Sequence, residues 1–115
     1  MVEKDTNSIF VDIDGVITTL SNGTDYSTAE PNYEMINIIN RLYDAGYNIV
    51  FYSARGSVTG IDWRQVTEEQ LQRWGVKYDK LMLSKPFFWY LIDDRTLNPY
   101  CNECRKRIDD IINHK

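Results

Sequence analysis

The sequence has few cysteines, a single histidine and no long apolar run. Two cysteines, Cys101 and Cys104, are too few for a disulfide framework, and with one histidine they do not make a four-ligand zinc site. The longest apolar runs, such as residues 86–92, are far shorter than the roughly 20 residues of a membrane helix. Residues 1–7 are too polar and acidic for a secretory signal. We therefore expect a cytoplasmic protein with no membrane span.

The chain also lacks an excess of positive charge. Lys and Arg total 13 against 17 Asp and Glu, so the formal net charge is -4, which disfavours a role in coating nucleic acid. A hydrophobic fraction of 43% is typical of globular chains rather than disordered ones. A length of 115 residues corresponds to about one domain. We expect one folded domain that covers residues 1–115.

Short apolar runs rich in β-branched and aromatic residues predict four strands. They lie at residues 8–13, 47–52, 80–83 and 87–92, and the first has the pattern of a strand that is buried on both faces. Residues 18–29 are polar and have no period, so they predict a long loop of the kind that often carries function.

Three helices are expected between and after these strands. The first starts near Pro31 and stops at Gly46, and the second covers about residues 62–74, where residues 67–70 have the spacing of a capping box. Asn98 and the proline after it are expected to open the last helix. Strands that alternate with helices predict an α/β fold, with a mainly parallel sheet between layers of helices, hence three layers.

Two carboxylates follow the first predicted strand. Asp12 and Asp14 are two residues apart in an extended segment, so their side chains share one side, and Gly15 permits a tight turn. In a parallel sheet, ligands bind beyond the carboxyl ends of the strands. Two carboxylates in one small space need a cation or a shared proton, which a metal or acid–base site supplies. Taken alone, the motif is equally the polar end of a strand followed by a turn.

The ends of the later strands carry further polar residues. The Ser53 hydroxyl and the backbone N–H groups after it, from Ala54 on, could hold an anionic oxygen, and the Arg55 guanidinium suits phosphate. Asp93 and Asp94 directly follow the last apolar run, where an acidic pair is costly to bury without a cation.

The same part of the sequence holds three lysines, any of which could place a positive charge near these strand ends. Lys85 stands just before the last predicted strand, and Lys77 and Lys80 are nearby competitors. Any one of them can also be an ordinary solvated surface charge.

The order of these residues resembles the four motifs of the haloacid dehalogenase (HAD) superfamily of phosphohydrolases. Asp-Ile-Asp-Gly-Val-Ile at 12–17, Ser53, Lys85 and Asp-Asp at 93–94 match in sequence over most of the chain. Lys-Pro before the last predicted strand and Asp-Asp-Arg after it look most like small phosphatases of capsule and surface-polysaccharide biosynthesis. The Ser-Ala-Arg at 53–55 is similar to the phosphatase domain of phage-type polynucleotide kinase-phosphatases. The resemblance implies a HAD-like, Rossmann-like fold.

The resemblance also implies a Mg²⁺-dependent phosphomonoester hydrolase. Asp12 would attack phosphorus and form an aspartyl-phosphate, and Asp14 would protonate the leaving oxygen and then activate water. Mg²⁺ would be held by Asp12, the backbone carbonyl of Asp14, and Asp94, with Asp93 behind it. The remaining implied groups contact the phosphoryl oxygens: Ser53 and Lys85 as catalytic residues, and Gly15, Ala54 and Arg55 as substrate-binding residues.

The intervals between the motifs bear on the substrate. Residues 15–48 and 56–79 leave no room for the cap domain of many HAD phosphatases, so the site should be open, covered only by loops or by a neighbouring subunit of a homo-oligomer. We expect a small phosphorylated substrate such as a sugar phosphate, and Tyr26 and Trp63 could contact a sugar or a base. A nucleic-acid 3′-phosphate is disfavoured by the acidic balance.

Two interpretations from other classes remain. One is a catalytically silent HAD-fold binding protein. The other is a receiver domain of a signalling protein, which also combines acidic residues, a hydroxyl and a lysine. The order of motifs argues against a receiver, whose acidic pair comes first, whereas here Asp93 and Asp94 come last.

Overall fold

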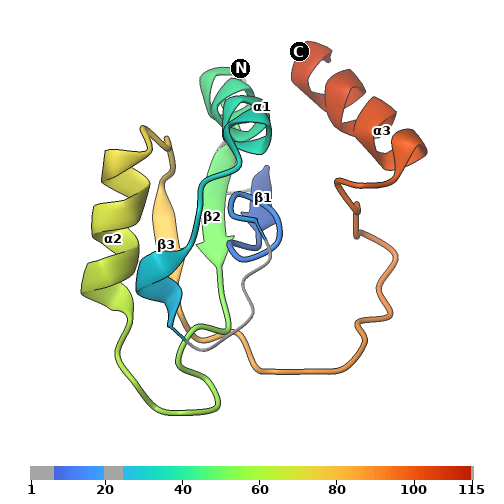
Figure 1. The fold of residues 1–115 in the computed structure, drawn as a ribbon. Helices are drawn as coiled ribbons and strands as arrows, with labels where there is room; N and C mark the ends of the chain where they lie inside the picture. The colour runs from blue at the N-terminus through green and yellow to red at the C-terminus, as the bar shows by residue number, and fades with distance from the viewer. Residues whose placement is uncertain (1–6, 20–24, 115) are drawn as a thin grey trace.

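The computed structural model describes residues 7–19 and 25–114 and contains a three-stranded parallel sheet (Figure 1). The strands are β1 (Ser8–Val11), β2 (Asn48–Tyr52) and β3 (Lys80–Met82), in the order β1-β2-β3. In register, Phe10 pairs with Val50 of β2. Because all strands are parallel, the residues that follow them gather at one edge of the sheet.

Two βαβ units build this sheet, and a last helix follows it. Asn32 caps the helix between β1 and β2, since its Oδ1 accepts the Met35 N–H at 3.2 Å, and Gly46 ends that connection with a φ of 102°. In Figure 1 the last helix lies across the sheet from the second one. The helices are the short 3-10 helix η1 (Tyr26–Thr28), α1 (Tyr33–Asp44), α2 (Arg64–Arg73) and α3 (Asn102–Asn113).

The hydrophobic core lies between the central strand and the helices. Ile49 and Phe51 on β2 have no solvent exposure, and α1 buries five apolar side chains, from Met35 to Leu42. The predicted α/β class and parallel sheet are confirmed, in a small single domain that is consistent with a Rossmann-like fold. The described residues between Gly15 and Asn48 form η1 and α1. Within the described ranges, no helix is long and apolar enough to cross a membrane.

The predicted strand at residues 87–92 is wrong. Residues 86–97, which we call the arm, are irregular and exposed throughout, with Trp89 88% and Ile92 99% accessible. No backbone–backbone hydrogen bond recorded among the described residues involves the arm. A strand requires a paired neighbour, which apolar composition does not encode, and the arm swings away from the sheet instead (Figure 1).

The path of the arm changes the environment of β1. Within the part of the chain that the structure describes, only β2 pairs with β1, so the other edge of β1 is open. Phe10 is 56% exposed there. The prediction that this strand is buried on both faces is also wrong, because Ser8 and Phe10, which share one face, are both exposed, whereas Ile9 and Val11 on the other face are more buried.

One predicted helix cap and one predicted helix start differ from the structure. Helix α2 begins at Arg64, so residues 67–70 lie inside it and do not cap it. The Thr67 hydroxyl instead accepts from Arg55 Nη1 at 2.9 Å. Helix α3 begins at Asn102, and Asn98 instead closes a turn by accepting the Cys101 N–H at 3.1 Å. Asn and Pro are common in turns as well as in first helical turns, so Asn98 and Pro99 do not by themselves fix where α3 begins. Residues 20–24 of the predicted loop lie outside the described residues.

Candidate active site

The turn after β1 presents two carboxylates at the carboxyl edge of the sheet. The carbonyl of Ile13 accepts N–H groups from Val16, Ile17 and Thr18 at 3.0 to 3.2 Å, which holds the turn closed. Gly15 has a φ of 87°, a conformation that residues with a Cβ rarely adopt. This tight turn fixes the main chain that carries Asp12 and Asp14.

Asp12 lies beside a lysine. Its Oδ2 is 3.5 Å from Nζ of Lys85, and its Oδ1 accepts the Ile13 N–H at 2.8 Å. Burial raises the pKa of the Asp12 carboxyl above its ordinary value, and the nearby Asp14 charge also raises it, whereas Lys85 and the Ile13 N–H oppose the shift. Asp12 is thus a partly buried carboxylate whose nearest recorded counter-charge is one ammonium group.

The main chain holds Lys85 in place. Its N–H donates to the Ser53 carbonyl at 3.2 Å, and its own carbonyl accepts the Ser57 hydroxyl at 2.5 Å. Its Nζ also lies 5.3 Å from the centre of the Phe88 ring. Of the three lysines considered from sequence, Lys85 is the one beside Asp12. Lys77 pairs with Asp44 at 2.9 Å, and Lys80 is exposed at the start of β3.

The loop after β2 is joined to the loop after β3. The Ser53 N–H donates to the Met82 carbonyl at 2.9 Å, and its Oγ accepts the Arg55 N–H at 3.1 Å. Ser53 is almost fully buried. None of the hydrogen bonds recorded among the described residues uses the Ala54 N–H. For that N–H and for the Ser53 hydroxyl hydrogen, no acceptor is recorded among the described residues.

The side chain of Arg55 is fully buried, and it contacts protein rather than the cleft. Its Nε and Nη2 donate to the two oxygens of Asp14, both at 2.9 Å. Its Nη1 donates to Thr67 Oγ1 at 2.9 Å and to Gln70 Oε1 at 2.7 Å, and its guanidinium lies 4.8 Å from the Tyr26 ring centre. Four of its five N–H groups are therefore used within the protein. This geometry does not support the predicted contact between Arg55 and phosphate.

Sequence reasoning missed the residues that surround Arg55. Thr67 and Gln70 are buried on one face of α2, and their spacing of three residues is the signal that could have found them. Tyr26 and Trp63 pack edge to face, with ring centres 5.2 Å apart, so Tyr26 contacts Trp63 and Arg55 rather than an open surface.

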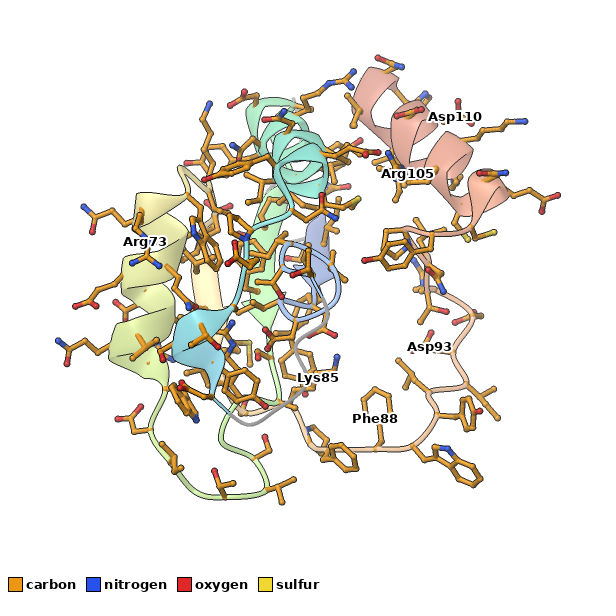
Figure 2. The ribbon with its side chains drawn as sticks, viewed as in Figure 1. Arg73, Lys85, Phe88, Asp93, Arg105 and Asp110 are labelled. Atoms are coloured by element: carbon orange, nitrogen blue, oxygen red, sulfur yellow. The ribbon has the colours of Figure 1, made fainter. Side chains whose placement is uncertain are left out.

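A cleft of about 790 Å³ lies between the open edge of β1, helix α1 and the arm. Asp12 and Lys85 line it on the sheet side, and Asp93 lines it on the arm side. Figure 2 shows Lys85 and Asp93 on opposite sides of this space, with Phe88 on the arm between them. The cleft is open to solvent and mixed in character, with apolar side chains of the arm facing the carboxylate.

The structure does not bring all the acidic residues together. Asp93 Oδ1 accepts the Arg95 N–H within the arm at 2.8 Å, and Asp94 is exposed there. Among residues 7–19 and 25–114, no three acidic, histidine or cysteine side chains gather in a set that could hold a metal ion. Asp12 and Asp14 are thus held by the packed part of the chain, whereas Asp93 and Asp94 follow the course of the arm.

The chain matches no family model and no curated protein. A crystal structure of a structural-genomics target from Vibrio cholerae is similar over 93% of this chain and 97% of that one, with a TM-score of 0.77 and 25% identity. A chain in the structure of a Pnkp1/Rnl/Hen1 complex is similar over 89% of this chain and 33% of its own length, with a TM-score of 0.55 and 18% identity. These neighbours are consistent with a HAD-like or polynucleotide kinase-phosphatase-like fold.

Proposed function

We propose that this protein is a Mg²⁺-dependent phosphomonoester hydrolase in which Asp12 is the nucleophile. The observation that carries the proposal is the contact of Asp12 Oδ2 with Lys85 Nζ at 3.5 Å, at the wall of an open cleft. A carboxylate next to a fixed cation suits attack on an anionic ester, because the cation offsets the repulsion between nucleophile and substrate. The turn that carries Asp12 also supplies a second carboxylate, Asp14.

The donors after β2 are suited to the phosphoryl oxygens. The Ala54 N–H and the Ser53 hydroxyl hydrogen are available, and Lys85 adds a positive charge from the loop after β3. Donors that are fixed before the substrate arrives stabilise charge in the transition state at little reorganisation cost. The loops after β2 and β3 would therefore hold one phosphoryl group together.

The oxygen donors after β1 fit a magnesium ion. Mg²⁺ prefers hard oxygen ligands, keeps several waters and is often bound by one or two carboxylates together with substrate phosphate. Asp12 offers a carboxylate, and the carbonyl of Asp14 accepts none of the hydrogen bonds recorded among the described residues. A bound Mg²⁺ would neutralise charge on the phosphoryl group. Asp94, with Asp93 behind it, would complete the ligands only if the arm moved toward Asp12.

The side chains perform two steps. Asp12 forms a bond to phosphorus while the ester oxygen leaves with the bonding electron pair, and Asp14 supplies the proton which that oxygen needs. Asp14 then removes a proton from water, whose oxygen displaces Asp12 from phosphorus. Phosphate is released, Asp12 returns as a carboxylate, and Asp14 is protonated again.

The open site admits small and large esters, and the charge of the chain favours a small one. The described part of the chain has no cap over the cleft, so its width does not limit the leaving group. The net charge of -4 disfavours a polyanion such as nucleic acid. A sugar phosphate or another small phosphorylated metabolite is the substrate class that we propose.

The test is phosphate release from a panel of sugar phosphates and a 3′-phosphorylated oligonucleotide, with and without Mg²⁺. We expect Mg²⁺-dependent turnover of a sugar phosphate that Asp12→Asn abolishes. Preference for the oligonucleotide, with activity that falls steeply as salt rises, would replace the substrate class but keep the chemistry. No turnover of any ester would contradict the proposal and favour a binding role.

A further inference from the structure

We propose that Arg55 is a positioning residue that orients the Asp14 carboxylate for proton transfer and does not bind phosphate. This inference rests on the proposed hydrolase function. It starts from the paired contacts of Arg55 Nε and Nη2 with the two Asp14 oxygens, both at 2.9 Å. Such a two-point contact fixes the plane of a carboxylate as well as its position.

The guanidinium is itself fixed from the opposite side. Nη1 donates to Thr67 at 2.9 Å and to Gln70 at 2.7 Å, both on α2. Gln70 in turn donates to the Tyr26 carbonyl at 2.7 Å, and the Tyr26 ring covers the guanidinium at 4.8 Å. Helix α2 and η1 thus hold one arginine, and that arginine holds Asp14.

The same contacts exclude Arg55 from the substrate. Its side chain has no solvent exposure, and four of its five N–H groups are already donated to Asp14, Thr67 and Gln70. A phosphoryl group would have to displace Asp14 or α2 to reach more than one free N–H. The Asp14 carboxylate remains 24% exposed, so it can meet a leaving group while Arg55 stays behind it.

In the first proposed step, which forms the aspartyl-phosphate, the orientation of Asp14 matters only when the leaving oxygen needs a proton. Thr18 Oγ1 donates to Asp14 Oδ1 at 3.2 Å, so both carboxylate oxygens have fixed partners in the protein. An alkyl phosphate needs a proton on its leaving oxygen, whereas an activated aryl phosphate leaves without one. Loss of the Arg55 contact should therefore impair the first ester much more than the second.

The experiment compares, for Arg55→Lys, the single-turnover rate of alcohol release from an alkyl phosphate with that of p-nitrophenolate release from p-nitrophenyl phosphate, each with saturating Mg²⁺, and KM for both. The single-turnover rate reports the first step alone, without the later hydrolysis in which Asp14 acts on both esters. Lysine keeps the charge but cannot make the two-point contact. We expect the single-turnover rate to fall by ~100-fold for the alkyl ester and by less than ~5-fold for the aryl ester, with KM little changed. Arg73→Lys, an exposed arginine on α2, is the matched control and should leave both rates unchanged.

Equal losses on both esters, or a rise in KM, would overturn the positioning role and leave the hydrolase proposal intact. A wild-type protein inactive on both esters would overturn the hydrolase proposal and the inference with it. If circular dichroism shows that Arg55→Lys does not fold, Thr67→Val decides, because it removes one Nη1 contact and leaves the Asp14 pair in place. It should show the same selective loss on the alkyl ester, smaller in size, and no selectivity would overturn the inference.

Discussion

Many apolar and acidic residues are buried or paired in the packed part of the chain, residues 7–19 and 25–85, whereas residues of the same kinds are exposed in the arm. In the packed part, Ile49 is fully buried and Asp14 is held by a buried arginine. In the arm, Ile92 is 99% exposed and Asp94 is open to solvent. Seven of the twelve residues of the arm are apolar, which is a higher share than in the packed part, so composition does not explain the contrast.

The difference shows which residues of the proposed site are in place before a substrate binds. Asp12 and Lys85 are fixed by a closed turn and by two main-chain contacts, and they need no rearrangement to act together. The acidic pair of the arm has only local partners, such as the contact of Asp93 with the Arg95 N–H. The nucleophile is thus set by the fold, whereas the last metal ligands depend on where the arm lies.

The same substitution, Ile to Ala, made once in the packed part and once in the arm tests this difference in burial most strongly. Ile49→Ala should lower the free energy of unfolding by about 3–5 kcal/mol, because it leaves a cavity in the core. Ile92→Ala should change it by less than about 0.5 kcal/mol, since the side chain is exposed. Urea unfolding measures both. A large loss for Ile92→Ala would mean that the arm is packed in solution.

The second prediction concerns the lysine that the packed part holds beside Asp12. Lys85→Met should lower kcat by ~100-fold, because the charge that offsets the nucleophile and the phosphoryl group is lost. Lys80→Met is the matched control at the start of β3 and should leave kcat unchanged. Equal activity of the two variants, measured by phosphate release, would contradict the role of the 3.5 Å contact.

A third, smaller effect tests whether the arm takes part. Asp94→Asn should raise the Mg²⁺ concentration for half-maximal activity by ~10-fold, if the arm closes on Asp12 during the reaction. Asp110→Asn, an exposed acid on α3 (Figure 2), is the control. An unchanged Mg²⁺ requirement in the Asp94 variant would show that the arm stays apart and that other ligands, or water, complete the site.

The smallest effect concerns stability and pH. Because burial raises the pKa of Asp12, the folded state disfavours its ionised form, so folding loses stability as the pH rises through that pKa. Asp12→Asn should therefore raise Tm modestly at pH 7, and the gain should shrink as the pH falls and the wild-type carboxyl takes up its proton. A lower Tm for Asp12→Asn at pH 7 would mean that the ion pair with Lys85 outweighs burial.

Local sequence patterns are enough to predict the strands and helices of the packed part. The first three strands and helices α1 and α2 agree with prediction to within about two residues at most ends, because periodicity records which faces are buried. The placement of Asp12 and Lys85 at one edge follows from the parallel order of the strands. These features depend on short connections between neighbouring elements.

The errors all depend on partners that are distant in sequence. The sequence predicts Arg55 as a phosphate ligand, but in the folded protein its guanidinium binds Asp14 and Thr67. The arm looks like a strand, but a strand exists only when a neighbour accepts its hydrogen bonds. A residue type states what a side chain can bind, and the fold decides which partner it meets.

The most direct test of the account is to find the phosphate on the protein. Wild-type protein is mixed with a rapidly turned over phosphomonoester and Mg²⁺, quenched in acid within one turnover, and digested for mass spectrometry. The account predicts a phosphorylated peptide with the modification on Asp12, which hydroxylamine removes, as expected for an acyl phosphate. Turnover with no phosphate on Asp12, or with phosphate on another residue, would contradict it.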